Sequence, residues 1–168
     1  MAMVAALEGK THTTPLSQDN VDRHLKTWVE VKAILAAQDY DKLTRTLAVE
    51  QAYAKAKRLY QESHGGTAQF VAQHRLHWDL NQVQSQADAP FDPQETCILP
   101  NDFPYALEAD IRHLVLWSKR PLRMDDQVVH QHLVLRYPGH EIMFFIHSPT
   151  LQSVPALPHG HVFVYKRP

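Results

Sequence analysis

Hydrophobic residues recur every three or four positions in three segments of the first half of the chain. This spacing places them on one face of a helix. The first segment covers 21–38, with Ser17 or Asp19 as the residue that caps its start. The second covers 41–63 and the third 67–78, with two glycines between them. We therefore predict three helices over these ranges.

The second half contains short apolar runs rich in β-branched and aromatic residues, which are typical of strands. We predict strands at 113–117, 141–146 and 161–165. Between the first two strands, the hydrophobic spacing in 125–137 predicts a helix that starts at one of two adjacent aspartates. The polar segment 79–96 is predicted to be a connecting loop.

Proline divides the chain in the same way, because only Pro15 lies in 1–85 and the other ten prolines lie in 86–168. Proline disfavours helix interiors and central strands. We predict an α+β fold, with a helical N-terminal half packed on a small, mostly antiparallel sheet from the C-terminal half. Residues 1–18 are predicted to form a flexible N-terminus, and 19–168 a single domain.

Composition narrows the class of partner. Seventeen Lys and Arg against eighteen Asp and Glu give a net charge of −1, which argues against a nucleic acid polymer as ligand. No apolar run reaches the length of a membrane span, and no basic segment precedes the short N-terminal apolar stretch. The single cysteine, Cys97, fits a reducing compartment. We expect a cytoplasmic protein with a small-molecule ligand and no membrane partner, and leave open whether it is a homodimer.

Two prolines enclose the segment Leu99-Pro-Asn-Asp-Phe-Pro-Tyr105, and Glu108 follows shortly after it. One interpretation is a rigid loop that holds a site in place before the substrate arrives. Its two carboxylates, Asp102 and Glu108, can then take different catalytic roles if their environments differ. The alternative is an Asx-type turn with no role in function.

The tail of the chain carries Gln152, Ser153 and the sequence Pro158-His159-Gly160-His161. Residues two apart in a strand face the same side, so the two imidazoles are expected to project together. They can supply half of a metal site, with a third ligand such as His113, or donate hydrogen bonds to phosphate. Solvated imidazoles at a strand end are the alternative.

A basic run, with Lys119 and Arg123, follows Trp117. Arginine binds phosphate through two parallel hydrogen bonds, and a strand end is a common place for such a group. The alternative is a set of solvated loop charges. Neither a Rossmann nor a P-loop glycine motif, nor a GxSxG or HExxH motif, occurs in the sequence.

Three stretches taken together resemble a known family. HGGTAQFVAQHRLHW (64–78), LPNDFPYALEADIRHLVLWSK (99–119) and FFIHSPTLQSVPALPHGHVFV (144–164) are similar to the N-acetylglucosamine-induced protein family. The resemblance covers 25–166, and its most specific parts are NDFPY with HLVLWSK and the QSVPxLPHxHV tail. His147 departs from the family pattern, in which asparagine is expected at that position, so no role is carried over to it.

The resemblance implies a nucleotide N-glycosidase that hydrolyses UTP to uracil and ribose 5-triphosphate. Such a reaction needs a carboxylate near the anomeric carbon, for which Asp102 or Glu108 is the candidate. The remaining candidates serve substrate binding: amides for the uracil edge, rings for stacking, and basic or hydroxyl groups for the triphosphate. They are Asn101, Tyr105, His113, Trp117, Lys119, Arg123, Gln152, Ser153, His159 and His161.

No cofactor bound by the protein itself is expected, although Mg²⁺ is expected to accompany the triphosphate. Two other functions stay open from sequence. One is a metal-dependent hydrolase that uses His159 and His161. The other is a nucleotide- or sugar-phosphate-binding module without catalysis.

Overall fold

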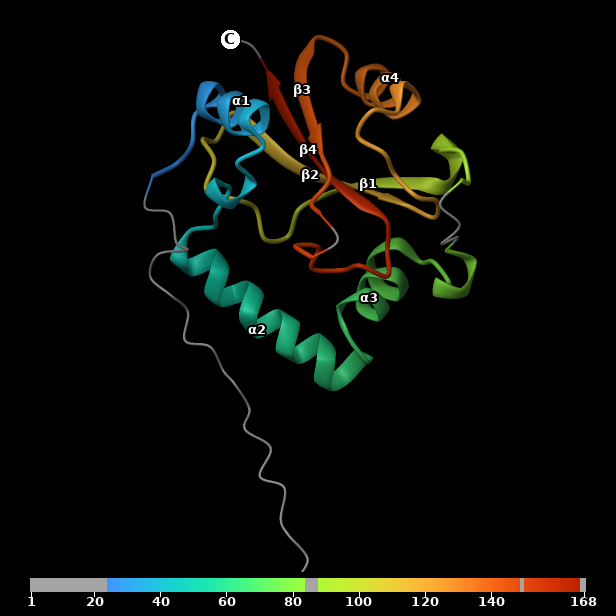
Figure 1. The fold of residues 1–168 in the computed structure, drawn as a ribbon. Helices are drawn as coiled ribbons and strands as arrows, with labels where there is room; N and C mark the ends of the chain where they lie inside the picture. The colour runs from blue at the N-terminus through green and yellow to red at the C-terminus, as the bar shows by residue number, and fades with distance from the viewer. Residues whose placement is uncertain (1–23, 84–87, 149, 167–168) are drawn as a thin grey trace, which may run out of the picture.

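The computed structural model describes residues 24–83, 88–148 and 150–166. Four strands form one antiparallel sheet in the order β1-β2-β4-β3 (Figure 1). The strands are β1 (Thr96–Pro100), β2 (Ile111–Ser118), β3 (His140–Phe145) and β4 (His159–Lys166). The helices lie mainly before the sheet in the chain, which confirms the predicted α+β class. The helices of the described ranges include none that is long and apolar enough to cross a bilayer.

The two central strands, β2 and β4, determine which side chains reach each face. Val115 pairs with His161, and Trp117 pairs with His159. Because side chains alternate along a strand, the odd-numbered residues of both strands point to one face of the sheet and the even-numbered residues to the other. The histidines of β2 and β4 therefore share a face.

The even-numbered face is closed by α4 (Gln127–Arg136). Val129 and Leu133 from this helix join β2 and β4 residues in a buried cluster. The Asp126 side chain accepts a hydrogen bond from the Val128 amide at 2.9 Å, which satisfies one of the free N–H groups at the helix start. The predicted helix with an aspartate at its start is confirmed.

Gly160 lies on this same face, tightly covered by an aromatic ring. A β-carbon at this position would lie 2.3 Å from the Cε2 atom of Phe144. We expect Gly160→Ala to lower the free energy of unfolding by about 1–3 kcal/mol, because the ring must leave its packed position. Urea denaturation measures this change. An unaltered midpoint would contradict the close packing of Phe144 on Gly160.

The odd-numbered face carries two separate apolar clusters. The first packs α1 (Trp28–Ala37) against Phe145 and Phe163 near one end of the strands. The second packs the helical segment 67–76 against Val115 and Trp117 near the other end. The segment 67–76 consists of α3 (Thr67–Phe70) and a wider π-helical turn after it. The stretch of sheet between the two clusters is where the buried histidines lie.

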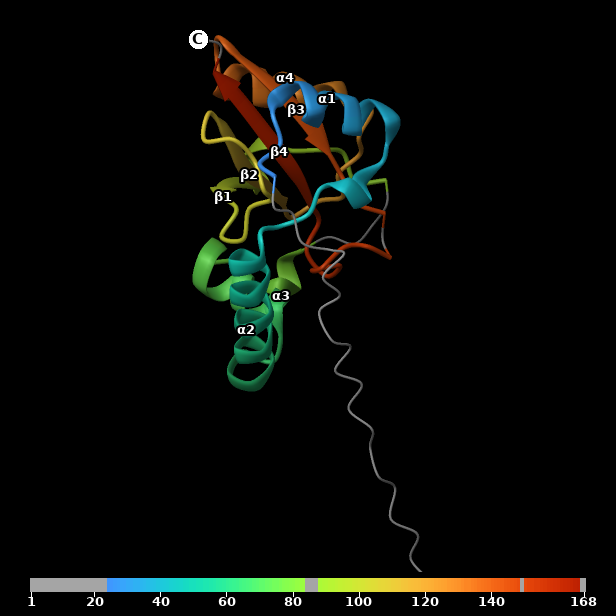
Figure 2. The same ribbon diagram turned by 90° about the vertical axis from the view of Figure 1, so that its left-hand side faces the viewer.

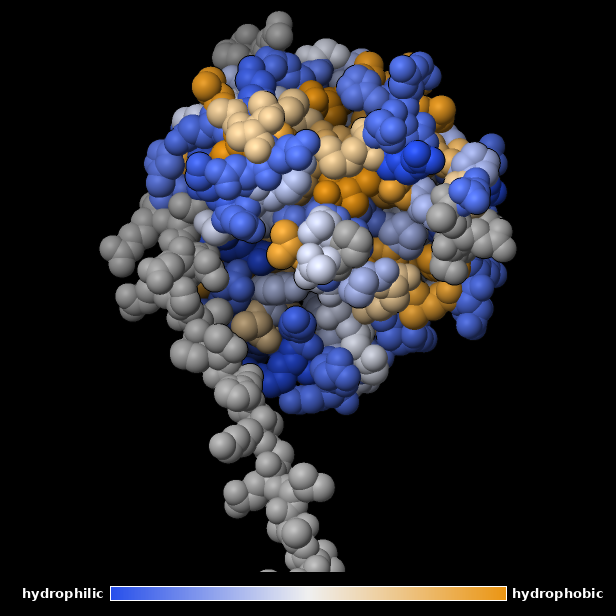
Figure 3. Space-filling model, in the orientation of Figure 1, coloured by the Kyte–Doolittle hydropathy of each residue, from blue (hydrophilic) through white to orange (hydrophobic). Residues whose placement is uncertain are grey.

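One long helix, α2 (Leu47–His64), runs across the end of the molecule that carries α3, away from α1 (Figures 1 and 2). None of its residues is buried, and its outer surface is mostly hydrophilic (Figure 3). Its half-buried residues recur at helical spacing: Val49, Glu50, Tyr53, Ala56, Tyr60 and His64. The helix therefore presents one narrow stripe to the rest of the protein.

The structure corrects several predicted boundaries. Residues 24–27 are not helical, because the backbone of Lys26 bonds to Ala106 and Glu108 while Thr27 caps α1. The second helix starts at Leu47 rather than 41, after a short 3-10 turn. The strand β1 was not predicted, and its first residue, Thr96, falls at the end of the predicted loop 79–96. The segment 1–18, with the proposed cap residues Ser17 and Asp19, lies outside the described residues.

Candidate functional site

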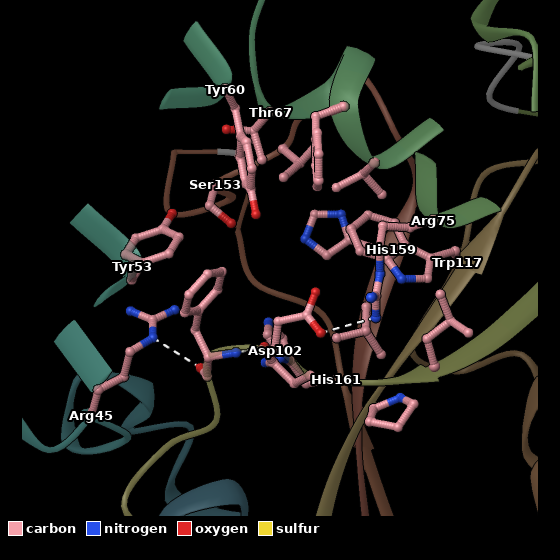
Figure 4. Close-up of a pocket in the computed structure, with 18 residues that line it drawn as sticks. Arg45, Tyr53, Tyr60, Thr67, Arg75, Asp102, Trp117, Ser153, His159 and His161 are labelled. Atoms are coloured by element: carbon pink, nitrogen blue, oxygen red, sulfur yellow. Dashed lines mark hydrogen bonds and ion pairs between the residues drawn. The ribbon is translucent and has the colours of Figure 1, made fainter. Parts of the chain in front are cut away.

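A cavity opens between the stripe on α2, the segment 67–76, the loop after β1 and the odd-numbered face of the sheet (Figure 4). The NDFPY loop contributes Asn101, Asp102 and Phe103 to its wall. β4 contributes His159 and His161 to the wall. The loop and the histidine pair, which were singled out separately in the sequence, therefore border one cavity.

Three histidines, His113, His159 and His161, are buried at the middle of this face, each less than 8% exposed. Burial disfavours the charged imidazolium and lowers the pKa of His113 to about 3. The same cause lowers the pKa of His159 and, more strongly, that of His161. All three rings are therefore neutral near pH 7.

Hydrogen bonds link two of these rings to the NDFPY loop. The Tyr105 amide donates to Nδ1 of His113 at 3.2 Å, and Nε2 of His113 lies 2.9 Å from Nδ1 of His161. The Asn101 side chain accepts from the Phe103 amide at 2.9 Å through its oxygen, and its nitrogen lies 3.2 Å from Nε2 of His113. The loop thus has the predicted Asx-type turn, and that turn is also part of the site.

His159 is held by a different contact. Its Nδ1 donates to the carbonyl oxygen of Leu157 at 2.7 Å, and its ring centroid lies 4.9 Å from that of Trp117. Trp117 borders the cavity beside it. The predicted same-side placement of His159 and His161 is confirmed, with 6.1 Å between their ring centroids.

Tyr105 packs against the buried histidines and does not border the cavity, in contrast to its predicted role in stacking on a base. It is 8% exposed and stacks on His113 at 4.7 Å. Burial raises the pKa of its hydroxyl to about 12. The hydroxyl lies 2.8 Å from Nε2 of His147, whose backbone carbonyl accepts a bond from Gln152. Tyr105 and Gln152 therefore lie outside the cavity wall, and His147 connects them.

The cavity wall carries one carboxylate, Asp102, which is partly exposed and pairs with Arg75 at 2.9 Å (Figure 4). A second guanidinium, that of Arg45, pairs with Glu50 at 3.1 Å and donates to the Phe103 carbonyl at 3.0 Å. Two arginines therefore stand on opposite sides of the cavity mouth (Figure 4). Both are held by partners that a stronger anion can compete with.

Aromatic rings form much of the remaining wall. Tyr60 of α2 stacks on Phe70 of α3 with 3.8 Å between centroids, and Tyr53 lies edge-on to Phe103 at 5.3 Å. Burial, and to a lesser extent the charge of Asp102, raise the pKa of the Tyr60 hydroxyl. Flat, apolar walls of this kind suit a planar ring.

Several residues predicted for the site lie elsewhere. Glu108 is exposed and borders a separate surface hollow beside Trp28, so the two carboxylates are not brought together. Lys119 bonds to the Gln82 side chain at 3.1 Å, and Arg123 is an exposed partner of Asp125 at 3.7 Å. The basic run follows the end of β2 and lies outside the cavity wall, although Trp117, just before it, borders the cavity. Ser153 does border the cavity, while Gln152 does not.

The residues that sequence reasoning missed come from the helical half. They are Arg45, Tyr53, Tyr60, Phe70 and Arg75. Arg75 and Phe70 lie within the first family-like stretch, 64–78, which was the one available signal. Arg45, Tyr53 and Tyr60 have no local motif, because only the placement of α2 and of the residues just before it brings them to the cavity.

The geometry also bears on the predicted metal alternative. Across 24–83, 88–148 and 150–166, no group of three or more His, Cys, Asp or Glu side chains is arranged to hold a metal ion. The nitrogens of His113 and His161 that face each other are joined by a hydrogen bond instead of converging on a common point. These rings are suited to hydrogen bonding.

Comparison with known proteins gives consistent matches. An uncharacterized protein of Saccharomyces cerevisiae, YPL067C, is 27% identical over 175 residues, which cover 89% of this chain and 86% of the yeast protein. N-acetylglucosamine-induced protein 1 of Candida albicans is 23% identical over 171 residues, which cover 82% of this chain and 67% of that protein. A crystal structure of a protein named HTC1 matches with a TM-score of 0.61 at 26% identity, covering 84% of this chain and 85% of HTC1.

The family match extends over both halves of the fold. Residues 27–165, from the cap of α1 to the end of β4, match the family described as "Protein of unknown function (DUF3605)". This range contains all three of the stretches in which the resemblance was seen, and the Candida relative carries the name that the resemblance predicted. The resemblance is therefore confirmed, and the chain belongs to the DUF3605 family.

Proposed function

We propose that the cavity hydrolyses the N-glycosidic bond of UTP and releases uracil and ribose 5-triphosphate. The observation that carries this proposal is the position of Asp102. It is a partly exposed carboxylate on the wall of an aromatic-walled cavity that also carries two neutral imidazoles, with an arginine on either side. Each of these parts matches one chemical demand of the reaction.

In the proposed reaction, a water oxygen bonds to C1′ of the ribose while the bond from C1′ to N1 of uracil breaks. The electron pair of that bond leaves with the base, and the ribose passes through an oxocarbenium-like transition state. Asp102 accepts the proton of the attacking water and stabilises the positive charge. A neutral imidazole N–H from His161 stabilises the negative charge on the leaving base, as a donor does in an oxyanion hole. The proton then passes from Asp102 through solvent to the uracil anion, so water and substrate supply all the atoms of the products and Asp102 is restored.

Arg45 and Arg75 are assigned to the triphosphate, in place of Lys119 and Arg123. Guanidinium groups bind phosphate oxygens through two parallel hydrogen bonds. Mg²⁺ is assigned to the triphosphate itself and not to a protein site. When Arg75 turns to the phosphates, Asp102 is released from its ion pair and becomes available to water.

Incubation with UTP and Mg²⁺ followed by chromatography tests the proposal. We expect free uracil from UTP and at least tenfold slower release from uridine, because uridine lacks the groups that the two arginines bind. Arg75→Met should bring the rate on UTP closer to that on uridine. Intact UTP after long incubation with folded protein would overturn the proposal.

One observation favours a second candidate, a nucleotide-binding module without catalysis. Asp102 is neutralised by Arg75 in this structure, as a purely structural carboxylate would be. The two functions are separated by a thermal-shift assay run beside the chromatography. A rise in Tm with UTP that stays intact identifies the binding module, since a bound ligand stabilises a folded protein without turnover.

A further inference from the structure

We propose that His161 and His159 form a fixed donor–acceptor pair that recognises a planar ring with an N–H group beside a carbonyl oxygen. The proposal rests on the proposed function for the identity of the ring, uracil. The recognition itself follows from which nitrogen carries the hydrogen on each of three buried imidazoles. Backbone groups determine these positions, because a backbone N–H can only donate and a carbonyl oxygen can only accept.

The first hydrogen position is set by the Tyr105 amide. A backbone N–H can only donate, so Nδ1 of His113, which lies 3.2 Å from it, carries no hydrogen. Since burial keeps this ring neutral, its one hydrogen is on Nε2. That atom faces Nδ1 of His161 at 2.9 Å and Nδ2 of Asn101 at 3.2 Å, and only the imidazole nitrogen can accept.

The second position follows from the first. Nδ1 of His161 accepts from His113 and so carries no hydrogen, and burial keeps this ring neutral as well. Its hydrogen is therefore on Nε2, which makes no hydrogen bond to any described residue. In the described part of the chain, the one fully buried side-chain nitrogen without a hydrogen-bond partner is Nδ1 of His147. Nε2 of His161 also has no partner, so it is not fully buried, and it is reached from the cavity that His161 borders. His161 presents an N–H donor there.

His159 has the opposite arrangement. The Leu157 carbonyl can only accept, so Nδ1 of His159, 2.7 Å away, carries the hydrogen. The ring is neutral, so Nε2 carries no hydrogen. By the same argument as for His161, this atom is not fully buried. His159 therefore presents an acceptor to the same cavity, two residues along β4 from the His161 donor.

Uracil matches this pair when its O4 carbonyl oxygen accepts from His161 while its N3–H donates to His159. Cytosine held in the same orientation places a bare N3 against the bare nitrogen of His159 and an amino group against the His161 N–H. Both contacts are then lost, because like groups face each other. A methyl group on N3 of uracil removes one contact and fills its space. His113 acts here as a positioning residue, since it sets the hydrogen position of His161 without touching the base.

Two measurements test the proposal. Long-range ¹H–¹⁵N NMR reports the hydrogen position on each imidazole, and we expect Nε2–H for His113 and His161 and Nδ1–H for His159 at pH 7.5. Titration calorimetry then compares UTP, CTP and 3-methyl-UTP in the Asp102→Asn variant, which keeps the ligand intact. We expect CTP and 3-methyl-UTP to bind at least tenfold more weakly than UTP, as expected when a buried polar group loses its partner.

Variants locate the effect. His159→Ala should reduce the ratio between UTP and 3-methyl-UTP to below about threefold, whereas His130→Ala, which removes an exposed histidine of α4, should leave the ratio unchanged. Reversed hydrogen positions on His159 or His161, or equal affinities for the three ligands, would overturn the proposal. Absence of uracil release by the wild type would instead overturn the glycosidase function, because neither the NMR assignment nor the affinity ratios depend on turnover.

Discussion

Asp102→Asn is expected to lower uracil release from UTP by at least 100-fold while leaving the fold intact. The amide has the shape of the carboxylate, but it can neither take a proton from water nor stabilise positive charge on the ribose. General-base catalysis typically contributes 10²–10⁴-fold, which sets the expected size. The lost ion pair with Arg75 is partly exposed, so the free energy of unfolding should fall by less than about 1 kcal/mol.

Glu108→Gln is the matched control, because it makes the same chemical change at the exposed carboxylate beside Trp28. Its rate should equal that of the wild type. Chromatography of the released base gives the rates, and Tm values establish that both variants are folded. A wild-type rate for Asp102→Asn, or a similar loss in both variants, would show that Asp102 does not carry the chemistry.

The second large effect is acid destabilisation from the buried histidines. The pKa of His113 is about 3 in the folded protein, against an ordinary value of 6.5. Below pH 6.5 the unfolded chain therefore binds protons that the folded protein cannot, so stability falls as the pH is lowered. Each such ring contributes a loss of up to about 1.4 kcal/mol per pH unit. For His113 the loss between pH 7.5 and 5 is roughly 2 kcal/mol, and the lowered pKa of His161 adds to it.

Urea denaturation at pH 7.5, 6.0 and 5.0 measures this loss. The window lies above the ordinary pKa of Asp and Glu side chains, about 4, so it reports mainly on histidines. His130→Gln, which removes an exposed histidine, should keep the slope of stability against pH, and His161→Phe should reduce it. A free energy of unfolding that is constant from pH 7.5 to 5.0 would contradict the assignment of neutral, buried rings.

The strands β2 and β4 were predictable because their apolar runs are buried on both faces and are bounded by turn residues. β1 was missed because Thr96–Pro100 ends in a proline and lies at the edge of the sheet, where one row of backbone groups needs no partner. The start of α1 was missed for a different reason. Leu25 continues the helical spacing, but the backbone of Lys26 is bound to another segment of the chain.

In the site, alternation along a strand was enough to place His159 and His161 together. The positions of Tyr105 and Glu108 outside the cavity were not predictable. Both residues are close to Asp102 in the sequence, but this closeness does not determine on which side of the sheet their side chains lie. The two arginines at the cavity mouth could not be predicted from the sequence for a related reason. Arg45 is 58 residues from Phe103, whose carbonyl it binds, and no local pattern encodes such a contact.

The long helix α2 has a consequence for how the protein fluctuates. It has no buried residue, and it meets the rest of the fold mainly through Arg45 just before its start and the Tyr60–Phe70 stack near its end. A segment with few buried apolar contacts opens locally at a free energy well below that of global unfolding. Its amide hydrogens therefore exchange with solvent sooner than those of β2 and β4. The cavity wall formed by α2 therefore opens locally more often than the sheet on the other side of the cavity. A ligand that contacts both α2 and the sheet slows the amide exchange of α2.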